Sequence, residues 1–117
     1  MSNVGQKAQD GLVAMMKHII LKAPPIQDLD LESAGFDSEA GEEICKALAH
    51  ANITTLTFIS LIYNASWLDS DEKCGAWAQV FKSQTNLTEL ELYGCEVSSS
   101  GQAIIKAACS KAKFSLL

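Results

Sequence analysis

The sequence predicts an α/β protein in which short strand–helix units repeat along the chain and pack against one another. One observation is the spacing Leu-x-x-Leu-x-Leu-x-x-Cys-x-Val over residues 87–97, which indicates a short strand that bends through a serine-rich turn into a helix. A second is a weaker copy of this pattern over residues 26–44. Because one such unit cannot bury its own apolar side, the copies are expected to stack as a short solenoid, which is right-handed because connections between parallel strands cross over in that sense.

Composition narrows the classes of function. The chain has 117 residues, enough for one domain (residues 1–117) with a modest core, and 48% of them are apolar. All nine cations are lysines; they are scattered, and 14 acids leave a net charge of −5, which argues against nucleic-acid binding. The apolar run 12–21 is interrupted by Lys17 and His18, is too short for a membrane span and lacks a secretory cleavage pattern. We therefore expect a cytoplasmic protein that does not bind membranes.

Residues 1–25 are expected to cap the first face of the stack. Residues 1–10 are polar and predicted to be frayed. A helix is predicted from Leu12 to Lys22, where apolar residues at helical spacing are Leu12, Met15, Met16, Ile19 and Ile20. Pro24 and Pro25 end that helix, because proline lacks the amide donor and disfavours helical geometry in the residue before it.

The first repeat is assigned to residues 26–52. Its strand, at about residues 27–31, directs Leu29 and Leu31 inward and leaves three acids outward: Asp28, Asp30 and Glu32. The segment 36–39 is typical of a helix N-cap, with acids near the helix start.

The second repeat is assigned to residues 53–86. From Gly41 to Ile53, and again from Gly75 to Leu87, there are 12 residues, and an asparagine precedes the second residue of each pair. This spacing predicts inward positions at Ile53, Leu56, Phe58 and Leu61, and outward positions at Thr55, Thr57 and Ile59. The repeat also carries a surplus segment around Tyr63–Trp67.

The third repeat is assigned to residues 87–113, with outward positions at Glu89, Glu91 and Tyr93. Residues 114–117 resemble the start of a further strand. A parallel sheet that ends there would have an open edge, so we expect either a fragment of a longer protein or self-association through this C-terminal edge.

The pattern over residues 26–117 resembles the leucine-rich repeat family, nearest its ribonuclease-inhibitor-like branch. The resemblance implies parallel strands on a concave face, helices on a convex face and protein binding through the concave face. It also implies that Cys95 takes the position where the family has Asn or Cys, whose side chain bridges the backbone of successive coils. Ala34 and Leu61 are assigned to the same position in the other two repeats.

The predicted binding site is the outward sheet face, which carries five acids. Its residues are Asp28, Asp30, Glu32, Thr55, Thr57, Ile59, Glu89, Glu91 and Tyr93. Such a face favours a protein partner with a basic surface. The alternative is a solvated face that is charged for solubility. Trp67, on the surplus segment, is the other candidate contact residue, either as an interface anchor or as packing over the convex edge.

No motif predicts catalysis, a cofactor or a metal. The four cysteines, at positions 45, 74, 95 and 109, form no Cys-x-x-Cys pair and favour free buried thiols over a zinc site. The leading prediction is a non-catalytic protein-interaction module. Two alternatives remain: the recognition part of a larger adaptor, of the ubiquitin-ligase or innate-immune-sensor type, and a small enzyme that uses its Cys and His residues.

Overall fold

The computed structural model describes residues 3–22, 24–32, 36–109 and 111–115. Over this part of the chain it has four helices and one parallel sheet of four short strands. In chain order the elements are α1 (Asn3–Leu21), β1 (Asp28–Asp30), α2 (Ser38–Ala51), β2 (Phe58–Ser60), α3 (Asp71–Lys82), β3 (Glu89–Glu91), α4 (Ser99–Ala108) and β4 (Lys113–Ser115). The predicted α/β class with parallel strands is therefore confirmed.

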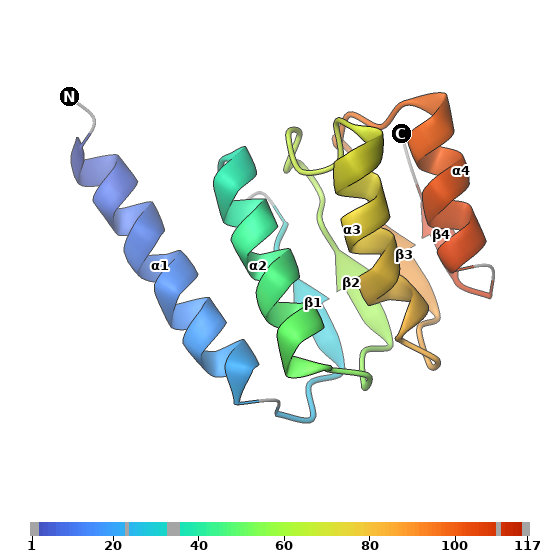
Figure 1. Ribbon diagram of the computed structural model, residues 1–117, viewed down its shortest axis with the longest axis horizontal. Coiled ribbons are helices and arrows are strands. Elements are labelled where there is room, and N and C mark those ends of the chain that lie inside the picture. The colour runs from blue at the N-terminus through green and yellow to red at the C-terminus, as the bar shows by residue number, and fades with distance from the viewer. Residues whose placement is uncertain (1–2, 23, 33–35, 110, 116–117) are drawn as a thin grey trace.

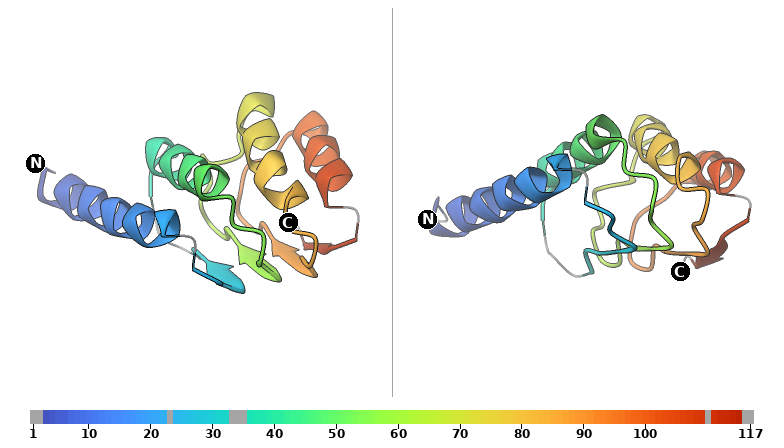
Figure 2. Two further views of the ribbon diagram at one scale, coloured as in Figure 1. Left: turned by 60° about the horizontal axis from the view of Figure 1, so that its bottom comes forward. Right: turned by 90° about the horizontal axis from the view of Figure 1, so that it is seen from below.

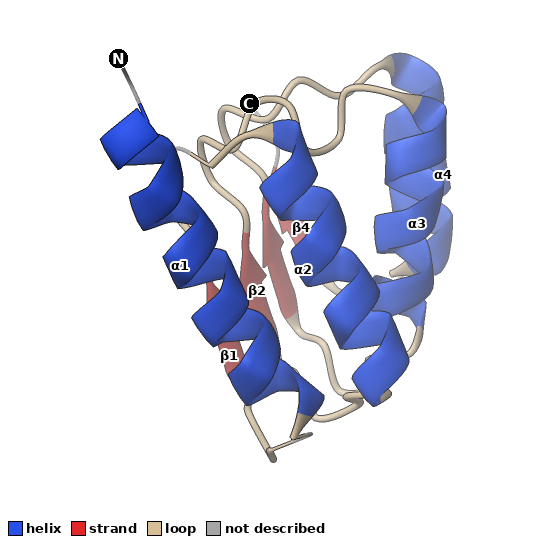
Figure 3. Ribbon diagram, turned by 60° about the vertical axis from the view of Figure 1, so that its left-hand side comes forward, coloured by secondary structure: helices blue, strands red, loops and turns tan. Residues whose placement is uncertain are grey.

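The strands lie in the order of the chain, β1-β2-β3-β4, and each is parallel to its neighbour. The four helices form a second layer on one side of the sheet (Figures 1 and 2). Seen from the α1 side, α1 and α2 run beside one another in front of the strands (Figure 3). No helix in the described part of the chain covers the other side of the sheet, and the side chains there form a separate face.

The core lies between the two layers. The strand register aligns Leu29, Ile59 and Leu90 in one row across the sheet, and all three are buried. The next inward positions, Leu31, Leu61 and Leu92, are buried in the same apolar cluster as the helix residues Ile44, Leu48, Trp77, Phe81 and Ile105. Burying each large aliphatic side chain stabilises the fold by about 1.5–3 kcal/mol, which makes this shared interior the main source of stability.

Local signals set the helix starts. The Asp37 carboxylate accepts a hydrogen bond from the Ala40 amide at the start of α2. Ser70 and Ser98 are the corresponding N-caps of α3 and α4. These caps satisfy amides that have no partner within the helix, and they fix where each strand-to-helix turn ends.

The first helix differs from its prediction. It begins at Asn3, so the expectation that residues 1–10 are frayed is wrong for the described part of that segment. Two contacts tie α1 to the start and middle of α2: the Gln9 side chain bonds Asp37, and Lys17 Nζ lies 2.6 Å from Glu43 Oε1. The inward side of α1 carries Val13, Met16 and Ile20, whereas Leu12, Met15 and Ile19 of the predicted apolar stripe are exposed.

The register predicted for the second repeat is wrong by three residues. Phe58 pairs with Asp28 and Glu89, so it belongs to the outward row, and Ile59 pairs with Leu29 and Leu90. Leu56 therefore takes the first apolar position, which the prediction gave to Ile53. The misleading signal was the asparagine: Asn52 is the C-cap of α2 in left-handed conformation (φ 54°), and it does not stand directly before the strand.

A fourth strand is present close to where it was predicted, at Lys113–Ser115. Phe114 pairs with Leu90, so it occupies the second apolar row, not the first. Residues 116–117, which the prediction included, lie outside the described residues. The sheet order puts β4 at one edge and β1 at the other, and self-association through the β4 edge stays a prediction.

Candidate partner-binding face

The side of the sheet that faces away from the helices is here called the acidic face. Side chains alternate between the two sides of a strand, so the residues that flank the buried leucines point outward. The register aligns Asp28, Phe58 and Glu89 in one row, and Asp30, Ser60 and Glu91 in the next. Glu32 and Tyr93 extend this face beyond the strand ends. Five acids therefore lie on one face, on either side of a central strand that carries none.

The structure brings together most of the predicted site residues. Asp28, Asp30 and Glu32 are exposed, and Glu89, Glu91 and Tyr93 are half-buried. Ile59 does not belong to the face: it is fully buried in the core, so its assignment as a partner contact is wrong. Phe58 and Ser60 take the central positions instead, because the register of β2 is shifted.

Thr55 and Thr57 lie before β2, not on it. The Thr55 hydroxyl donates to the Ile26 carbonyl at 2.5 Å, and the Thr57 hydroxyl donates to the Gln27 carbonyl at 3.3 Å. The Thr57 amide also donates to the Gln27 carbonyl, at 2.8 Å. Both threonines therefore tie the start of the second unit to the first, and their hydroxyls are engaged with the backbone.

Ser60 is the central residue of the acidic face. It is 0% exposed, and its hydroxyl has no hydrogen-bond partner. Buried hydroxyls nearly always find a partner, because an unsatisfied polar group costs about 1–3 kcal/mol. The sheet therefore holds an unsatisfied hydroxyl between Asp30 and Glu91.

The acids repel one another. The pKa of Glu91 is raised, first by loss of hydration, then by a hydrogen bond with Glu89, and then by the charges of Glu89, Glu32 and Asp30. Within the described part of the chain, the ion pairs lie elsewhere, at Lys17–Glu43, Lys46–Glu42 and Lys73–Asp69. Lys113 of β4 pairs with Glu89 in the strand register, so a cation brought to this face would meet an excess of carboxylates mainly toward β1.

Trp67 is not an exposed anchor. Its side chain is 1% exposed and stacks on Trp77, with ring centroids 5.9 Å apart and planes 9° from parallel. Its indole N–H donates to the Asp37 carbonyl at 2.9 Å. The exposed aromatic residue of the same segment is Tyr63, which is 63% exposed and lies over Gly94. The alternative interpretation, packing, therefore describes Trp67.

Sequence reasoning missed the residue that links the first two units. Asn64, not Leu61, stands in the position of Cys95, and its buried amide donates to the carbonyls of Leu31 and Leu61 at 2.8 and 3.2 Å. The Cys95 thiol donates to the Leu61 carbonyl at 3.0 Å, the bridging role expected for it. The signal was available, because residues 56–64 match Leu-x-x-Leu-x-Leu-x-x-Asn once Ile59 is aligned with Leu90. Ala34 lies outside the described residues.

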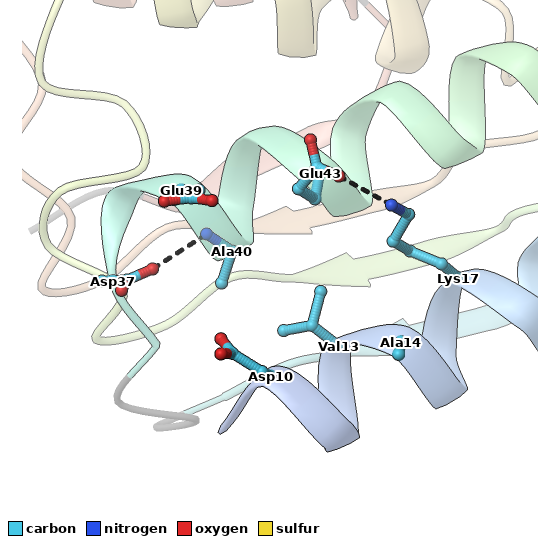
Figure 4. A pocket seen from close by; sticks show the side chains of 8 residues that line it. All are labelled: Asp10, Val13, Ala14, Lys17, Asp37, Glu39, Ala40 and Glu43. Carbon is cyan, nitrogen blue, oxygen red and sulfur yellow. Dashed lines mark hydrogen bonds and ion pairs between the residues drawn. The ribbon is translucent and has the colours of Figure 1, made fainter. Parts of the chain in front are cut away.

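Among the described residues, grooves lie beside the helices. The largest of three, about 410 Å³, runs between α2 and α3 and is lined by Trp67 and Trp77 together with Cys45, Ala49 and charged residues on its rim. One of about 210 Å³ lies where α3 and α4 end, with Phe81 and Cys109 in its lining. A smaller one of about 190 Å³ lies between α1 and α2 (Figure 4). Its charged groups include the Lys17–Glu43 ion pair and Asp37, the N-cap of α2, so packing of the two helices explains them.

The thiols and imidazoles form no reactive cluster in the part of the chain that is described. All four cysteines are free and buried. His18 and His50 are exposed. Among residues with a described position, no three His, Cys, Asp or Glu side chains could together hold a metal ion.

We expect the native thiols to react slowly. Burial raises the pKa of Cys45 to about 12 and that of Cys95 to about 11, and it also raises the pKa of Cys74 and Cys109. A raised pKa lowers the thiolate fraction, and only the thiolate attacks. With Ellman's reagent at pH 8, the folded chain should give almost no rapid colour, and the chain in denaturant should give four equivalents. Prompt reaction of one thiol in the folded chain would contradict this prediction.

No family model, no curated protein and no solved structure matches this chain. None of the helices in the described ranges is both long and apolar enough to cross a membrane.

Proposed function

We propose that the chain is a short solenoid of the leucine-rich repeat type that binds a basic protein partner through its acidic face, without catalysis. Three features support the solenoid: the strands follow the order of the chain, the apolar residues form rows across it, and Asn64 and Cys95 bond the backbone of the preceding unit. Such residues recur at one position per coil in a repeat architecture.

The observation that carries the binding proposal is the alignment of carboxylates across the sheet. Asp28 and Asp30 of β1 stand in the same rows as Glu89 and Glu91 of β3. Strands are spaced about 4.8 Å apart, so paired acids two strands apart lie roughly 10 Å from each other, about one Debye length at physiological salt. Their fields therefore overlap and attract a cationic surface, which raises the rate of association. Four unpaired thiols fit a reducing compartment such as the cytoplasm.

Charge reversal on the acidic face tests this function. The double variant Asp30→Lys with Glu91→Lys should weaken binding of a synthetic peptide rich in Lys and Arg by at least about tenfold, because two attractive charges become repulsive. The wild-type affinity should fall as salt rises. Isothermal titration calorimetry at two salt concentrations, with circular dichroism to verify folding, measures both effects.

The matched control reverses two exposed acids that lie off this face, Glu39 and Glu96, and changes the net charge by the same amount. This control variant should keep most of the affinity. If both double variants lose affinity equally, the peptide responds to net charge alone and the acidic face has no special role. If neither loses affinity, the proposal is wrong.

A further inference from the structure

The centre of the acidic face is a row of three residues, one from each of β1, β2 and β3. In the row Asp30–Ser60–Glu91, a small residue with a hydroxyl group separates two carboxylates. Phe58, two residues before Ser60 on β2, has a larger side chain and is half-buried on the same face. Two negative groups and one unsatisfied acceptor are thus arranged along a line across the strands. This arrangement differs from a general acidic surface because it fixes the direction in which donors must point.

The spacing favours a planar, branched cation over a compact one. Asp30 and Glu91 lie two strands apart, roughly 10 Å between backbones. A lysine ammonium is a point charge that must bring each oxygen to about 2.8 Å of one nitrogen. The N–H groups of a guanidinium lie in one plane and point outward from its different edges, so it can donate to both carboxylates with less movement of either side chain.

Ser60 supplies the second, independent observation. Its hydroxyl is fully buried and lacks a partner in the free chain. As the side chains of Asp30 and Glu91 turn toward a guanidinium, the hydroxyl between them can accept one of the remaining N–H groups. Binding would then remove an unsatisfied polar group, which adds to the preference for a ligand with several donors.

Aromatic rings flank the same position. Phe58 precedes Ser60 by two residues on β2, and Tyr93 follows Glu91 by two residues; both are half-buried on the acidic face. Guanidinium groups stack on aromatic rings, and they do so with a smaller loss of hydration than an ammonium. Loss of hydration and like charges already raise the pKa of Glu91, and a cation at this place would relieve that repulsion.

We infer that the row Asp30–Ser60–Glu91 is a subsite for an arginine side chain of the protein partner, and that it selects arginine over lysine. This inference rests on the proposed function, since it names the group by which a basic partner is held on the acidic face.

The test compares three peptides of equal length that differ at one central residue: arginine, lysine or citrulline, which has nearly the shape of arginine without its charge. The flanking residues carry two lysines in each peptide. Calorimetry with the full chain should give an affinity for the arginine peptide at least about tenfold above that for the lysine peptide, and the citrulline peptide should bind weakest. This order follows from the number and direction of donors.

Two serine variants test whether Ser60 is responsible for the preference for arginine over lysine. Ser60→Ala should reduce the preference for arginine over lysine about threefold or more, because it removes the acceptor between the carboxylates. Ser115→Ala is the matched control: Ser115 lies in the same row on the other side of Glu91, so the preference should not change. Ser60→Ala should fold at least as stably as wild type in a thermal scan, since it deletes a buried hydroxyl without a partner.

The possible outcomes distinguish the arginine subsite from the more general function of binding a basic partner. Equal binding of the arginine and lysine peptides, with both above citrulline, would overturn the arginine subsite and leave the basic-partner function standing. Equal binding of all three peptides would overturn the arginine subsite alone, because the flanking lysines would then account for the binding, and binding of none would overturn both. An arginine preference that Ser60→Ala and Ser115→Ala leave equally intact would show that another part of the face makes the selection, and it would also overturn the inference.

Discussion

Replacing Trp67 with alanine is expected to lower the free energy of unfolding by about 3–5 kcal/mol, the range for deleting a large buried aromatic side chain. The indole is 1% exposed and stacks on Trp77. The change opens a cavity where α2, α3 and the segment before α3 meet. It also leaves the Asp37 carbonyl without the indole donor, at the point where α2 begins. Urea denaturation followed by far-UV circular dichroism measures the loss.

The matched control for this prediction is Tyr63→Ala, four residues earlier in the same segment. Tyr63 is 63% exposed, so its removal should change stability by about 1 kcal/mol or less. If the two variants are equally stable, Trp67 does not hold the helices together as described.

Gly41 gives a sharper check of the same packing. A Cβ atom at Gly41 would lie 2.5–2.7 Å from three indole atoms of Trp67. Gly41→Ala alone should therefore cost about 1–3 kcal/mol through overpacking. In the Trp67→Ala background the added methyl has room, so its cost should largely disappear. A double-mutant cycle measures this coupling, and additive effects would contradict direct contact.

Replacing Asn64 with alanine is expected to cost about 1–3 kcal/mol, because the buried Leu31 carbonyl loses its side-chain donor, whereas the Leu61 carbonyl keeps the Cys95 thiol and the residue-64 backbone amide as donors. Its amide donates to the carbonyls of Leu31 and Leu61, so it connects the first unit to the second. Asn86→Ala is the control: this residue is exposed, and its loss should stay within about 0.5 kcal/mol. Chemical denaturation of both variants gives the comparison.

The variant Asn64→Asp separates hydrogen bonding from shape. An ionised carboxylate cannot donate, and burial of its charge is unfavourable, so this variant should be at least as unstable as Asn64→Ala at neutral pH. Burial raises the pKa of such a carboxyl group in the folded state above its unfolded value. The folded state then binds more protons, and the variant should gain stability relative to wild type as pH falls. Stability that does not change with pH would contradict the donor role.

The first and third units could be predicted from sequence because each has an unambiguous strand. Leu29 and Leu31 flank acids in one unit, and Leu90 and Leu92 flank acids in the other, so period-two alternation fixes which side is buried. The acids on the outward side of both strands follow from the same alternation. Prediction of Asp28, Asp30, Glu89 and Glu91 as neighbours on one face needed only the alignment of these two strands.

The second unit could not be predicted in this way because it is apolar on both sides. Phe58, Ile59 and Leu61 leave no clear alternation, so only spacing predicts the register, and the helix-capping Asn52 shifts that prediction by three residues. Ile53, which the spacing favoured, is buried in the core ahead of the strand, where its carbonyl accepts the buried Gln84 amide at 2.6 Å and the Gln84 oxygen accepts the Leu56 amide at 3.0 Å. A long-range side-chain contact of this kind leaves no local pattern in the sequence.

The same limit explains why the sequence singles out Trp67 as a candidate contact residue, although Tyr63 is the exposed aromatic residue of this segment. Both are aromatic residues on one segment, and only the third dimension decides which of them meets Gly41 and which stays in solvent. The burial of Ser60 could not be predicted from the residues around it in the sequence. Serine is usually a surface residue, and here its burial depends on the neighbouring strands β1 and β3. The Ser60 hydroxyl without a hydrogen-bond partner, at the centre of the acidic face, is therefore evident only in the folded structure.

The order of the strands along the sheet has a consequence for how the molecule opens. Sheet pairing joins each strand only to those next to it in the chain, and the helices pack in the same succession. Loosening at one end therefore removes support from a single neighbour and leaves the remainder intact. Backbone amides of β2 and β3 should exchange with deuterium most slowly, with protection declining toward both termini, so that the molecule frays inward instead of unravelling at its middle.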